Sequence, residues 1–431
     1  MSIKANIDSL KEDQKEKIRN ELTVRVEGNK YSGNTSNYIH PYKITDNDIY
    51  IPFCYSNKLN LKRRKREEFT QVNVSFTGKL REGQIAIKKE TLDILNKTGS
   101  VIISLYTGGG KTITSINIAC HIKMKTLVIV NKLILMTQWE ESILKVCPGA
   151  RVQILTPRSY MNDCDFYIIN AQNVEKFEEG FFSDIGVLIV DELHLIVAEK
   201  LSKALTHIEP RYLIGLSATS YRTDGFEPLI ELYFGKNKII RELYREHKVF
   251  CVFTGFVPTV EYTKDSKLNW GSILNSQSED NDRNDLIVNI VKKYPKRTFL
   301  IITKRVKHAR VLVEKLQENV ENVASLIGTE QEFDRDCRVL VGILQKCGTG
   351  FDFPKLDSLI LACDLQDYFI QALGRVFRRE DTVPYVFDLV DDNPILMRHY
   401  KNRKNVYIKH GGKICGYKIE DEGEYKHKRL I

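Results

Sequence analysis

Residues 101–112 read VIISLYTGGGKT, an apolar run followed by a glycine-rich turn and a Lys-Thr pair. The run predicts a buried strand, and ITSINIACHI (113–122) predicts a helix directly after the turn. Glycines let backbone N–H groups converge on phosphate oxygens, while the helix N-terminus and a lysine add positive charge. The alternative is a glycine-rich turn without a ligand. The candidate phosphate and magnesium ligands are Gly108, Gly109, Gly110, Lys111 and Thr112.

Similar apolar runs recur further along the chain. TLVIVN, DFYIIN, VLIVDE and YLIGLS are each too apolar to be half exposed, which is typical of central strands in a parallel sheet. The stretches between them are long enough for helices, so we expect helices on both faces. A polar segment, NSQSEDNDRND, precedes a second series, RTFLIIT, RVLVGIL, DSLILA and YVFDLV. The sequence therefore predicts an α/β chain with two tandem domains.

The expected boundaries follow these changes in texture. We expect a small accessory region at residues 1–77, a first domain at 78–245, a connecting segment at 246–280 and a second domain with a basic tail at 281–431. The accessory region contains five consecutive basic residues, Lys62 to Arg66. Such a run is typical of a phosphate contact, of a nuclear address or of a solvated linker.

The composition excludes several classes of protein. With 42% apolar and 28% charged residues, the 431-residue chain is unlike a disordered one. No run of about 18 apolar residues predicts a membrane span, and no apolar signal core is present. Nine cysteines without a CxxC pair predict reduced thiols and an intracellular protein. The net charge of +9 favours a polyanionic partner, although many basic chains bind no nucleic acid.

Two adjacent carboxylates end a later apolar run, VLIVDELH (187–194). Burying Asp191 and Glu192 at that point is costly unless they serve an ion. Asp191 fits a magnesium ligand, and Glu192 fits the residue that orients and deprotonates an attacking water. A strand-end acidic pair is otherwise often a helix cap. After the next run, the hydroxyls of Ser217 and Thr219 are placed to hydrogen-bond this pair.

The second series of runs ends in two basic segments. In QALGRVFR (371–378), Arg375 and Arg378 are spaced to share one helix face, and a guanidinium suits a transferring phosphoryl group. They are arginine fingers if the second domain faces the first, and a surface salt-bridge helix otherwise. HYKNRKNVYIKHG (399–411) interleaves tyrosines with cations, which suits strand binding and equally suits a solvated helix face with buried tyrosines.

Together these segments resemble the motifs of superfamily 2 helicases, in the right order. LREGQ, LYTGGGKT and DELH are similar to the adenine-reading motif and to motifs I and II, while SAT, GTGFDFP and QALGRVFR are similar to motifs III, V and VI. IVNKLILMTQW, SATSYRTDG, NDRNDLI and KCGTGFDFPKLDSLILA resemble helicases of large cytoplasmic DNA viruses, nearest the poxvirus transcript-release type. Phage repair helicases and eukaryotic transcription/repair-type helicases are more distant. Leu105, DELH in place of DESH, and Ser220 in place of proline depart from the pattern without removing a catalytic group.

The resemblance implies two RecA-like lobes around a cleft for ATP and Mg²⁺. Gln84 would read adenine, Thr112 and Asp191 would hold Mg²⁺, and Gly350 and Asp352 would lie near the ribose and γ-phosphate. The residues implied to couple the two sites are Ser217, Thr219 and Gln371. Nucleic acid would lie across both lobes, held mostly through its phosphates. The candidate nucleic-acid contacts are Asn131, Lys132, Gln138, Trp139, Asn170, Arg222, Thr303 and Lys304, with Trp139 equally suited to a core position.

The expected function is that of an ATP-dependent helicase that moves 3′ to 5′ along DNA, single-stranded or duplex with an overhang, and unwinds it. Viral transcript release, or DNA repair and recombination, is the expected role, in the host cytoplasm or the virion and without a membrane. RNA or an RNA–DNA hybrid is a further substrate, and an RNA polymerase or transcription factor a further partner. Two alternatives stay open: a duplex translocase that does not separate strands, and a nucleic-acid-binding subunit with a degenerate ATPase.

Overall fold

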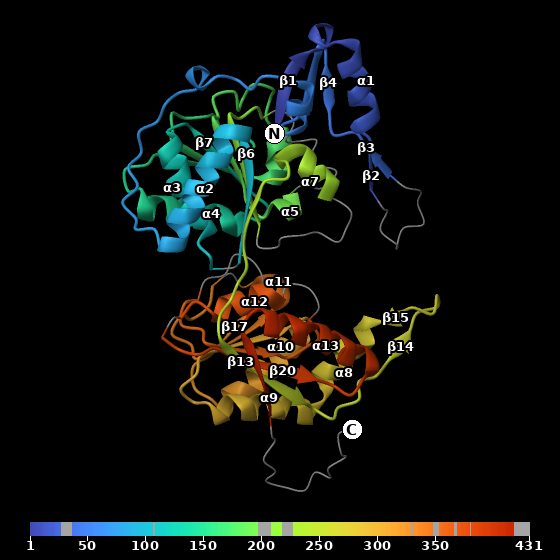
Figure 1. Ribbon diagram of the computed structural model, residues 1–431. Helices are drawn as coiled ribbons and strands as arrows, with labels where there is room; N and C mark the ends of the chain where they lie inside the picture. The colour runs from blue at the N-terminus through green and yellow to red at the C-terminus, as the bar shows by residue number, and fades with distance from the viewer. Residues whose placement is uncertain are drawn as a thin grey trace. The chain divides into compact units, whose positions relative to one another are not determined.

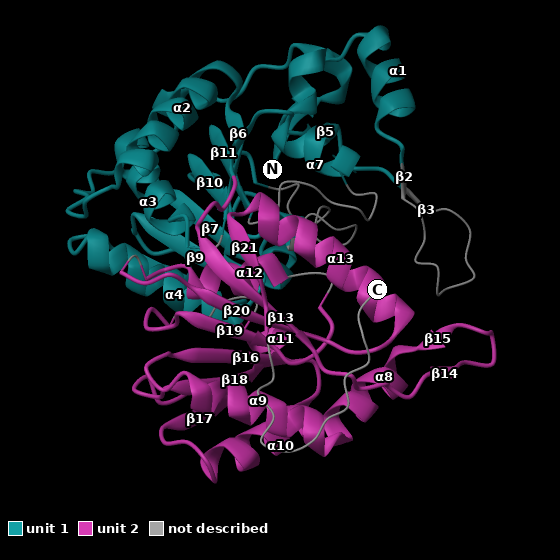
Figure 2. Cartoon of the chain, turned by 60° about the horizontal axis from the view of Figure 1, so that its bottom comes forward, with its two compact units in different colours: residues 1–241 teal, residues 242–431 magenta. Residues whose placement is uncertain are grey.

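The computed structural model describes residues 1–26, 37–106, 108–196, 208–217, 227–328, 330, 332–347, 353–365, 369–379 and 381–417. The chain divides into two compact units, Met1–Arg241 and Glu242–Ile431 (Figure 2). Each unit is built around a seven-stranded sheet, so the predicted pair of α/β domains is confirmed. No helix among the described residues is both long and apolar enough to cross a bilayer.

The sheet of the first unit is parallel throughout. Its strands are β6 (Ser100–Leu105), β7 (Thr126–Val130), β8 (Val152–Leu155), β9 (Phe166–Asn170), β10 (Val187–Val190), β11 (Tyr212–Ser217) and β12 (Lys238–Arg241). They lie in the order β12-β6-β11-β10-β7-β9-β8. Strands β6, β7, β9, β10 and β11 are buried along their whole length, as expected from their uninterrupted apolar runs.

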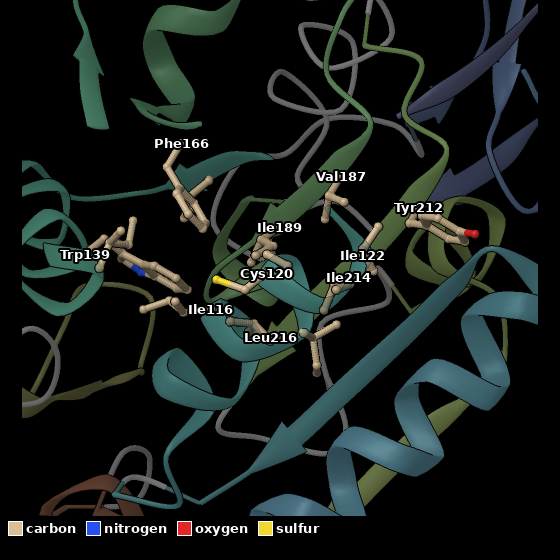
Figure 3. Close-up of a cluster of buried hydrophobic side chains, with 14 of the residues drawn as sticks. Ile116, Cys120, Ile122, Trp139, Phe166, Val187, Ile189, Tyr212, Ile214 and Leu216 are labelled. Carbon is tan, nitrogen blue, oxygen red and sulfur yellow. The ribbon is translucent and has the colours of Figure 1, made fainter. Parts of the chain in front are cut away.

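Helices cover both faces of this sheet (Figure 1). They are α2 (Glu82–Thr98), α3 (Lys111–Ile122), α4 (Leu133–Val146), α5 (Leu193–Ile196) and α7 (Glu227–Phe234), with a 3-10 turn η4 (Ala171–Lys176). Side chains of α2, α3 and α4 share one apolar cluster with alternate residues of β6, Val101 and Ile103 among them. Figure 3 shows part of this cluster, including Ile116 and Cys120 of α3 and Trp139 of α4. Ile102 points to the opposite face, where it joins residues of α5 and α7. Successive side chains of β6 are therefore buried on opposite faces of the sheet, which fixes the strand within the core. The end of β6 and the start of α3 lie at one edge of this core.

The accessory residues pack onto the first unit. They form a small antiparallel sheet, β1 (Ser2–Asn6), β5 (Asp48–Pro52) and β4 (Lys43–Thr45), beside α1 (Glu12–Glu21) and a short pair, β2 (Val24–Val26) and β3 (Asn37–Ile39). Three 3-10 turns complete the region: η1 (Ile7–Ser9), η2 (Tyr55–Leu59) and η3 (Arg66–Glu68). Within the basic run, Arg63 and Arg64 donate to the carbonyls of Arg211 and Ser183. The run therefore ties the accessory region to the first unit and is not a free linker.

The second unit has an equivalent parallel sheet. Its strands are β13 (His247–Phe253), β16 (Phe299–Thr303), β17 (Val323–Leu326), β18 (Val339–Ile343), β19 (Ser358–Leu361), β20 (Tyr385–Val390) and β21 (Gly412–Gly416), in the order β17-β18-β16-β19-β20-β13-β21. Its helices are α8 (Trp270–Glu279), α9 (Asn281–Lys293), α10 (Val306–Gln317), α11 (Leu344–Cys347), α12 (Phe369–Val376) and α13 (Pro394–Lys409). A two-stranded hairpin, β14 (Glu261–Tyr262) and β15 (Leu268–Asn269), precedes α8.

The expected connecting segment at 246–280 is wrong. Residues 247–253, HKVFCVF, form β13, which pairs with both β20 and β21 inside the second sheet. The boundary between units falls between Arg241 and Glu242. Residues 249–253 of this run, VFCVF, are all apolar and match a strand. The polar stretch that suggested a linker instead spans the end of α8 and the start of α9.

Two buried ionic networks hold the second unit together. Arg283 of α9 donates to Asp391 at 2.8 Å and to the carbonyl of Ala362 at 2.7 Å. Arg403 of α13 makes a two-pronged contact with Asp388 at 2.8 and 2.9 Å and a third bond to Asp364 at 2.7 Å. HYKNRKNVYIKHG is one predicted site for binding a nucleic-acid strand. This prediction is wrong for Arg403, Tyr400 and Tyr407, because these side chains are buried. Removing one partner of such a pair typically costs about 3 to 5 kcal/mol.

A buried histidine makes the second unit sensitive to acid. His308 of α10 shares a 2.9 Å hydrogen bond with the side-chain amide oxygen of Asn284. Burial, followed by the charge of Arg283, lowers the pKa of His308 to about 3. Below about pH 6.5 the unfolded chain therefore binds a proton that the folded unit does not. We expect stability to fall by about 1.4 kcal/mol for each pH unit between about pH 6.5 and the folded value.

The measurement is denaturant unfolding of the wild-type protein and of His308→Gln between about pH 7 and pH 5. Glutamine can still donate to Asn284 but does not titrate, so the variant should show a shallower loss of stability with acid. The matched control, His40→Gln, changes an exposed histidine and should leave the wild-type slope in place. Equal slopes for wild type and His308→Gln would contradict the prediction.

Candidate nucleotide and nucleic-acid site

The glycine loop follows β6 and leads into α3, in the predicted strand, loop and helix order. Gly108 and Gly110 have φ angles of 88° and 81°, in the left-handed region that favours glycine. Gly110 is also the residue before the first turn of α3, and a side chain added there would collide with the amide nitrogen of Gln84. The loop is therefore a backbone cradle that admits no Cβ at Gly110. Thr107 lies outside the described residues.

Lys111 and Gln84 lie on either side of this cradle. The Lys111 ammonium donates to the Leu105 carbonyl at 3.0 Å, which holds the side chain back over the loop. Gln84 is buried; its amide nitrogen donates to the Gly110 carbonyl at 3.4 Å, and its oxygen accepts from the Arg81 N–H at 2.8 Å. Thr112 is half-buried at the second position of α3. The structure therefore brings Gln84, Gly110 and Lys111 together, as the sequence predicted.

The acidic pair follows β10, next to β11 and β7 at the centre of the sheet. Asp191 is buried, and its two oxygens accept from the Trp139 indole at 2.8 Å and from the Glu192 N–H at 2.9 Å. Burial raises the pKa of Asp191 to about 6, the charge of Glu192 adds to this rise, and the Trp139 bond and the charge of Lys111 oppose it. A carboxylate in this position is stabilised by a cation, so the residues fit a magnesium ion.

Glu192 has a strained backbone, with a φ of 48° in a non-glycine residue. Its Oε2 atom is buried and accepts no hydrogen bond from the part of the chain that the structure describes. His194 Nδ1 lies 3.5 Å from this oxygen and 3.2 Å from the Ser217 hydroxyl. His194 thus links the acidic pair to the end of β11, a role that the sequence analysis did not assign to it.

Three of the candidate nucleic-acid contacts are buried, which contradicts their predicted role as direct contacts. Trp139 lies in the buried apolar cluster shown in Figure 3. It is 2% exposed, and its indole N–H donates to Asp191. Asn170 caps η4 by accepting from the Gln172 N–H at 3.0 Å. The Thr303 hydroxyl donates to the Arg305 carbonyl at 3.1 Å. In each case the polar group of the side chain is satisfied by a neighbouring backbone or side-chain group.

The other candidates keep a partly accessible position. Asn131, Lys132 and Gln138 lie around the start of α4, beside the exposed Leu133, and Lys304 follows β16 in the second unit. All four are half-buried. Arg222 and Thr219 lie outside the described residues, as do Gly350 and Asp352.

The arginines of the second unit do not lie on a shared helix face. Arg375 is buried within α12, but α12 ends at Val376 and Arg378 follows it, half-buried. The alternative of a surface salt-bridge helix is also wrong, because Phe369 and all residues from Gln371 to Val376 are buried. Burial lowers the pKa of Arg378. The guanidinium is nevertheless charged at neutral pH, because the ordinary pKa of arginine is so high. Neither amide atom of Gln371 has a hydrogen-bond partner within the described ranges.

The cysteines agree with the prediction of reduced thiols. All nine are free, and Cys120 and Cys147 approach one another with their sulfur atoms 3.5 Å apart. Burial raises the pKa of both thiols. They are therefore core residues and poor nucleophiles.

Comparison with known proteins identifies the family. The family described as "Type III restriction enzyme, res subunit" matches residues 77–222. The chain is 42% identical to the putative helicase 161L of Invertebrate iridescent virus 6 over 447 aligned positions, covering 97% of this chain and all of that protein. It is 30% identical to the putative helicase 055L of Frog virus 3 (isolate Goorha), covering 84% of this chain and 85% of that protein.

A solved structure supports the fold. S. cerevisiae Dbp5 bound to RNA and ADP BeF3 has a TM-score of 0.55 at 14% identity, covering 77% of this chain and 89% of that one. Two tandem RecA-like sheets with motif residues at their strand ends are the architecture of superfamily 2 helicases. The chain belongs to the superfamily 2 helicases of large DNA viruses.

Proposed function

We propose that this helicase hydrolyses ATP with Mg²⁺ and uses the hydrolysis to move along DNA and unwind it. The observation that carries the proposal is the meeting of Lys111, Asp191 and Glu192 at one edge of the first sheet. The charges of both Lys111 and Glu192 act on the pKa of Asp191, so the three groups share one electrostatic environment. A lysine and two carboxylates beside a glycine cradle are the groups that phosphoryl transfer needs.

Each group has a separate task in this proposal. The N–H groups of the cradle and the Lys111 ammonium bind the β- and γ-phosphates, while Thr112 and Asp191 hold Mg²⁺. Gln84, which is hydrogen-bonded to Arg81 and Gly110 beside the cradle, is the proposed adenine-reading residue. Bound ATP and Mg²⁺ supply the phosphoanhydride bond and the cation that neutralises phosphate charge.

Glu192 orients and deprotonates the attacking water, since its Oε2 accepts no hydrogen bond from the described residues and the neighbouring His194 Nδ1 lies 3.5 Å away. The link from Glu192 through His194 to Ser217 connects that carboxylate to β11. Arg375 and Arg378, with Gly350 and Asp352, are the proposed contribution of the second unit, and Gln371 and Thr219 the proposed coupling residues. Guanidinium groups stabilise the charge that develops on the phosphoryl group.

DNA is the proposed track, with Asn131, Lys132, Gln138, Lys304 and Arg222 as proposed contacts. RNA is the second candidate, because the yeast structure of similar fold was solved with RNA. Transcript release, with an RNA polymerase or transcription factor as partner, and DNA repair or recombination are the proposed roles. The DNA-virus relatives support a viral role of this kind.

The test is steady-state ATP hydrolysis with Mg²⁺, without nucleic acid and with single-stranded DNA, duplex DNA or RNA. We expect single-stranded DNA to stimulate hydrolysis most, together with displacement of the strand from a duplex with an overhang. Stronger stimulation by duplex, without strand displacement, would favour the translocase. No hydrolysis under any condition would favour the binding subunit with a degenerate ATPase.

A further inference from the structure

One segment of the second unit exposes several apolar side chains. From the last residue of β13 to the first residue of α8, Phe253 is 43% exposed, Val257 and Tyr262 are each 67% exposed, and Trp270 is 38% exposed. The β14–β15 hairpin in this segment extends away from the sheet of its own unit (Figures 1 and 2). The Glu261 N–H donates to the Ser272 hydroxyl at 3.0 Å, which ties the hairpin to α8.

His399 packs against the ring of Trp270. The His399 ring stacks on its indole with centroids 5.5 Å apart and an interplanar angle of 25°, so the exposed part of Trp270 lies away from His399. His399 is itself buried and hydrogen-bonded to Asp364 at 2.7 Å. Asp364 also accepts from Arg403, which Asp388 holds from the other side. An aromatic side chain backed by such a network is pre-organised for binding.

Cationic residues lie on the segments next to this indole. Arg305 is exposed, and its guanidinium lies beside Gly271, the residue after Trp270; a methyl group added at Gly271 would be 3.2 Å from it. Lys304 precedes Arg305, and the hairpin carries the exposed Lys264 and Lys267. Exposed aromatic faces next to lysine and arginine are the recurring features of surfaces that bind single-stranded nucleic acid.

We propose that bases of a single-stranded nucleic acid stack on Trp270, while Arg305 and the hairpin lysines contact its phosphates. The inference rests on the proposed function, and it adds a residue of the second unit, Trp270, on which bases stack. The hairpin also carries two exposed acids, Glu261 and Asp265, which balance its two lysines. With Lys304 and Arg305 added, a small positive excess is left near Trp270, and it favours a polyanion as the occupant over a neutral protein surface. Stacking needs only a base face, so the contact is independent of sequence.

The test compares Trp270→Ala, Trp270→Phe and wild type in filter-binding titrations with an oligothymidylate of about 12 nucleotides. We expect about tenfold weaker binding for the alanine variant, and near wild-type binding for phenylalanine, which keeps an aromatic face. Tyr160→Ala removes an exposed aromatic residue of the first unit and is the matched control, expected to bind as wild type. Thermal unfolding of each variant separates a binding defect from a folding defect.

An abasic strand of the same length makes the test specific for stacking. On that strand, wild type and Trp270→Ala should bind equally, because no base is present to stack. Equal binding of the two proteins to oligothymidylate, or an equal loss on both strands, would overturn the inference while leaving the proposed function standing. Absence of binding by the wild-type protein to any strand would instead contradict the proposed function.

Discussion

Replacing Glu192 with glutamine is expected to slow ATP hydrolysis by about 10² to 10⁴-fold, the range that a general base contributes. Glutamine keeps the size and shape of the side chain at a backbone position that is already strained, with a φ of 48°. It removes the negative charge that accepts a proton from water. Because Lys111, the glycine cradle and Asp191 are unchanged, ATP should still bind. Phosphate release measures the rate, and equilibrium dialysis measures ATP binding.

Glu175→Gln is the matched control for this variant. Glu175 is an exposed glutamate in η4 of the same unit, so its replacement makes the same chemical change away from the site. The control should hydrolyse ATP at the wild-type rate. If Glu192→Gln did so as well, Glu192 would not be the general base, and the acidic pair would be better explained as a structural turn after β10.

Replacing Lys111 with alanine is expected to lower ATP turnover by at least about 10² to 10³-fold, as when a preorganised charge-stabilising donor is removed. The ammonium is the cation that the loop holds over the phosphate cradle, through its 3.0 Å bond to the Leu105 carbonyl. Its loss also removes a positive charge that opposes the rise in the pKa of Asp191. Both effects weaken the site for ATP and Mg²⁺, so we expect weaker ATP binding as well as slower turnover.

Nucleic-acid binding should largely survive in Lys111→Ala, because the proposed stacking surface lies in the second unit. The measurements are phosphate release and filter binding with single-stranded DNA. Lys89→Ala, which removes an exposed lysine of α2, is the control for a general loss of positive charge and should match wild type in both assays. Full ATPase activity in Lys111→Ala would show that another group binds the phosphates.

Sequence patterns predicted the features of this chain that depend on local order. Each apolar run that the sequence analysis quoted forms a strand of one of the two sheets, because a run of this kind can be satisfied only by burial on both faces. The glycine loop lies between β6 and α3 because the apolar run before it forms a buried strand and the residues after it form a helix. The expectation at 246–280 fails because the polar stretch at 275–285 suggests a connection, although the five consecutive apolar residues 249–253 of β13 match a strand.

The parts that escaped prediction depend on contacts between distant residues. Trp139 and Asp191 are 52 residues apart in sequence, and only the folded structure shows that the indole N–H donates to the carboxylate. Asn170 and Thr303 lie at strand ends, where polar residues either cap the next turn or contact a ligand. The stacking of Trp270 on His399 likewise joins α8 to α13, and no spacing rule connects those helices.

The placement of the two tryptophans gives each unit its own optical reporter. The sequence contains two such residues, Trp139 in the first unit and Trp270 in the second. The first is buried with its N–H on the carboxylate of Asp191, and the second is partly exposed beside cationic side chains. Indole emission responds to local charge and solvent, so a Trp270→Phe chain reports spectroscopically on the surroundings of Asp191 alone. In the unsubstituted chain both tryptophans emit. The difference between its emission and that of the Trp270→Phe chain therefore reports on Trp270 at the surface of the second unit, without an attached dye.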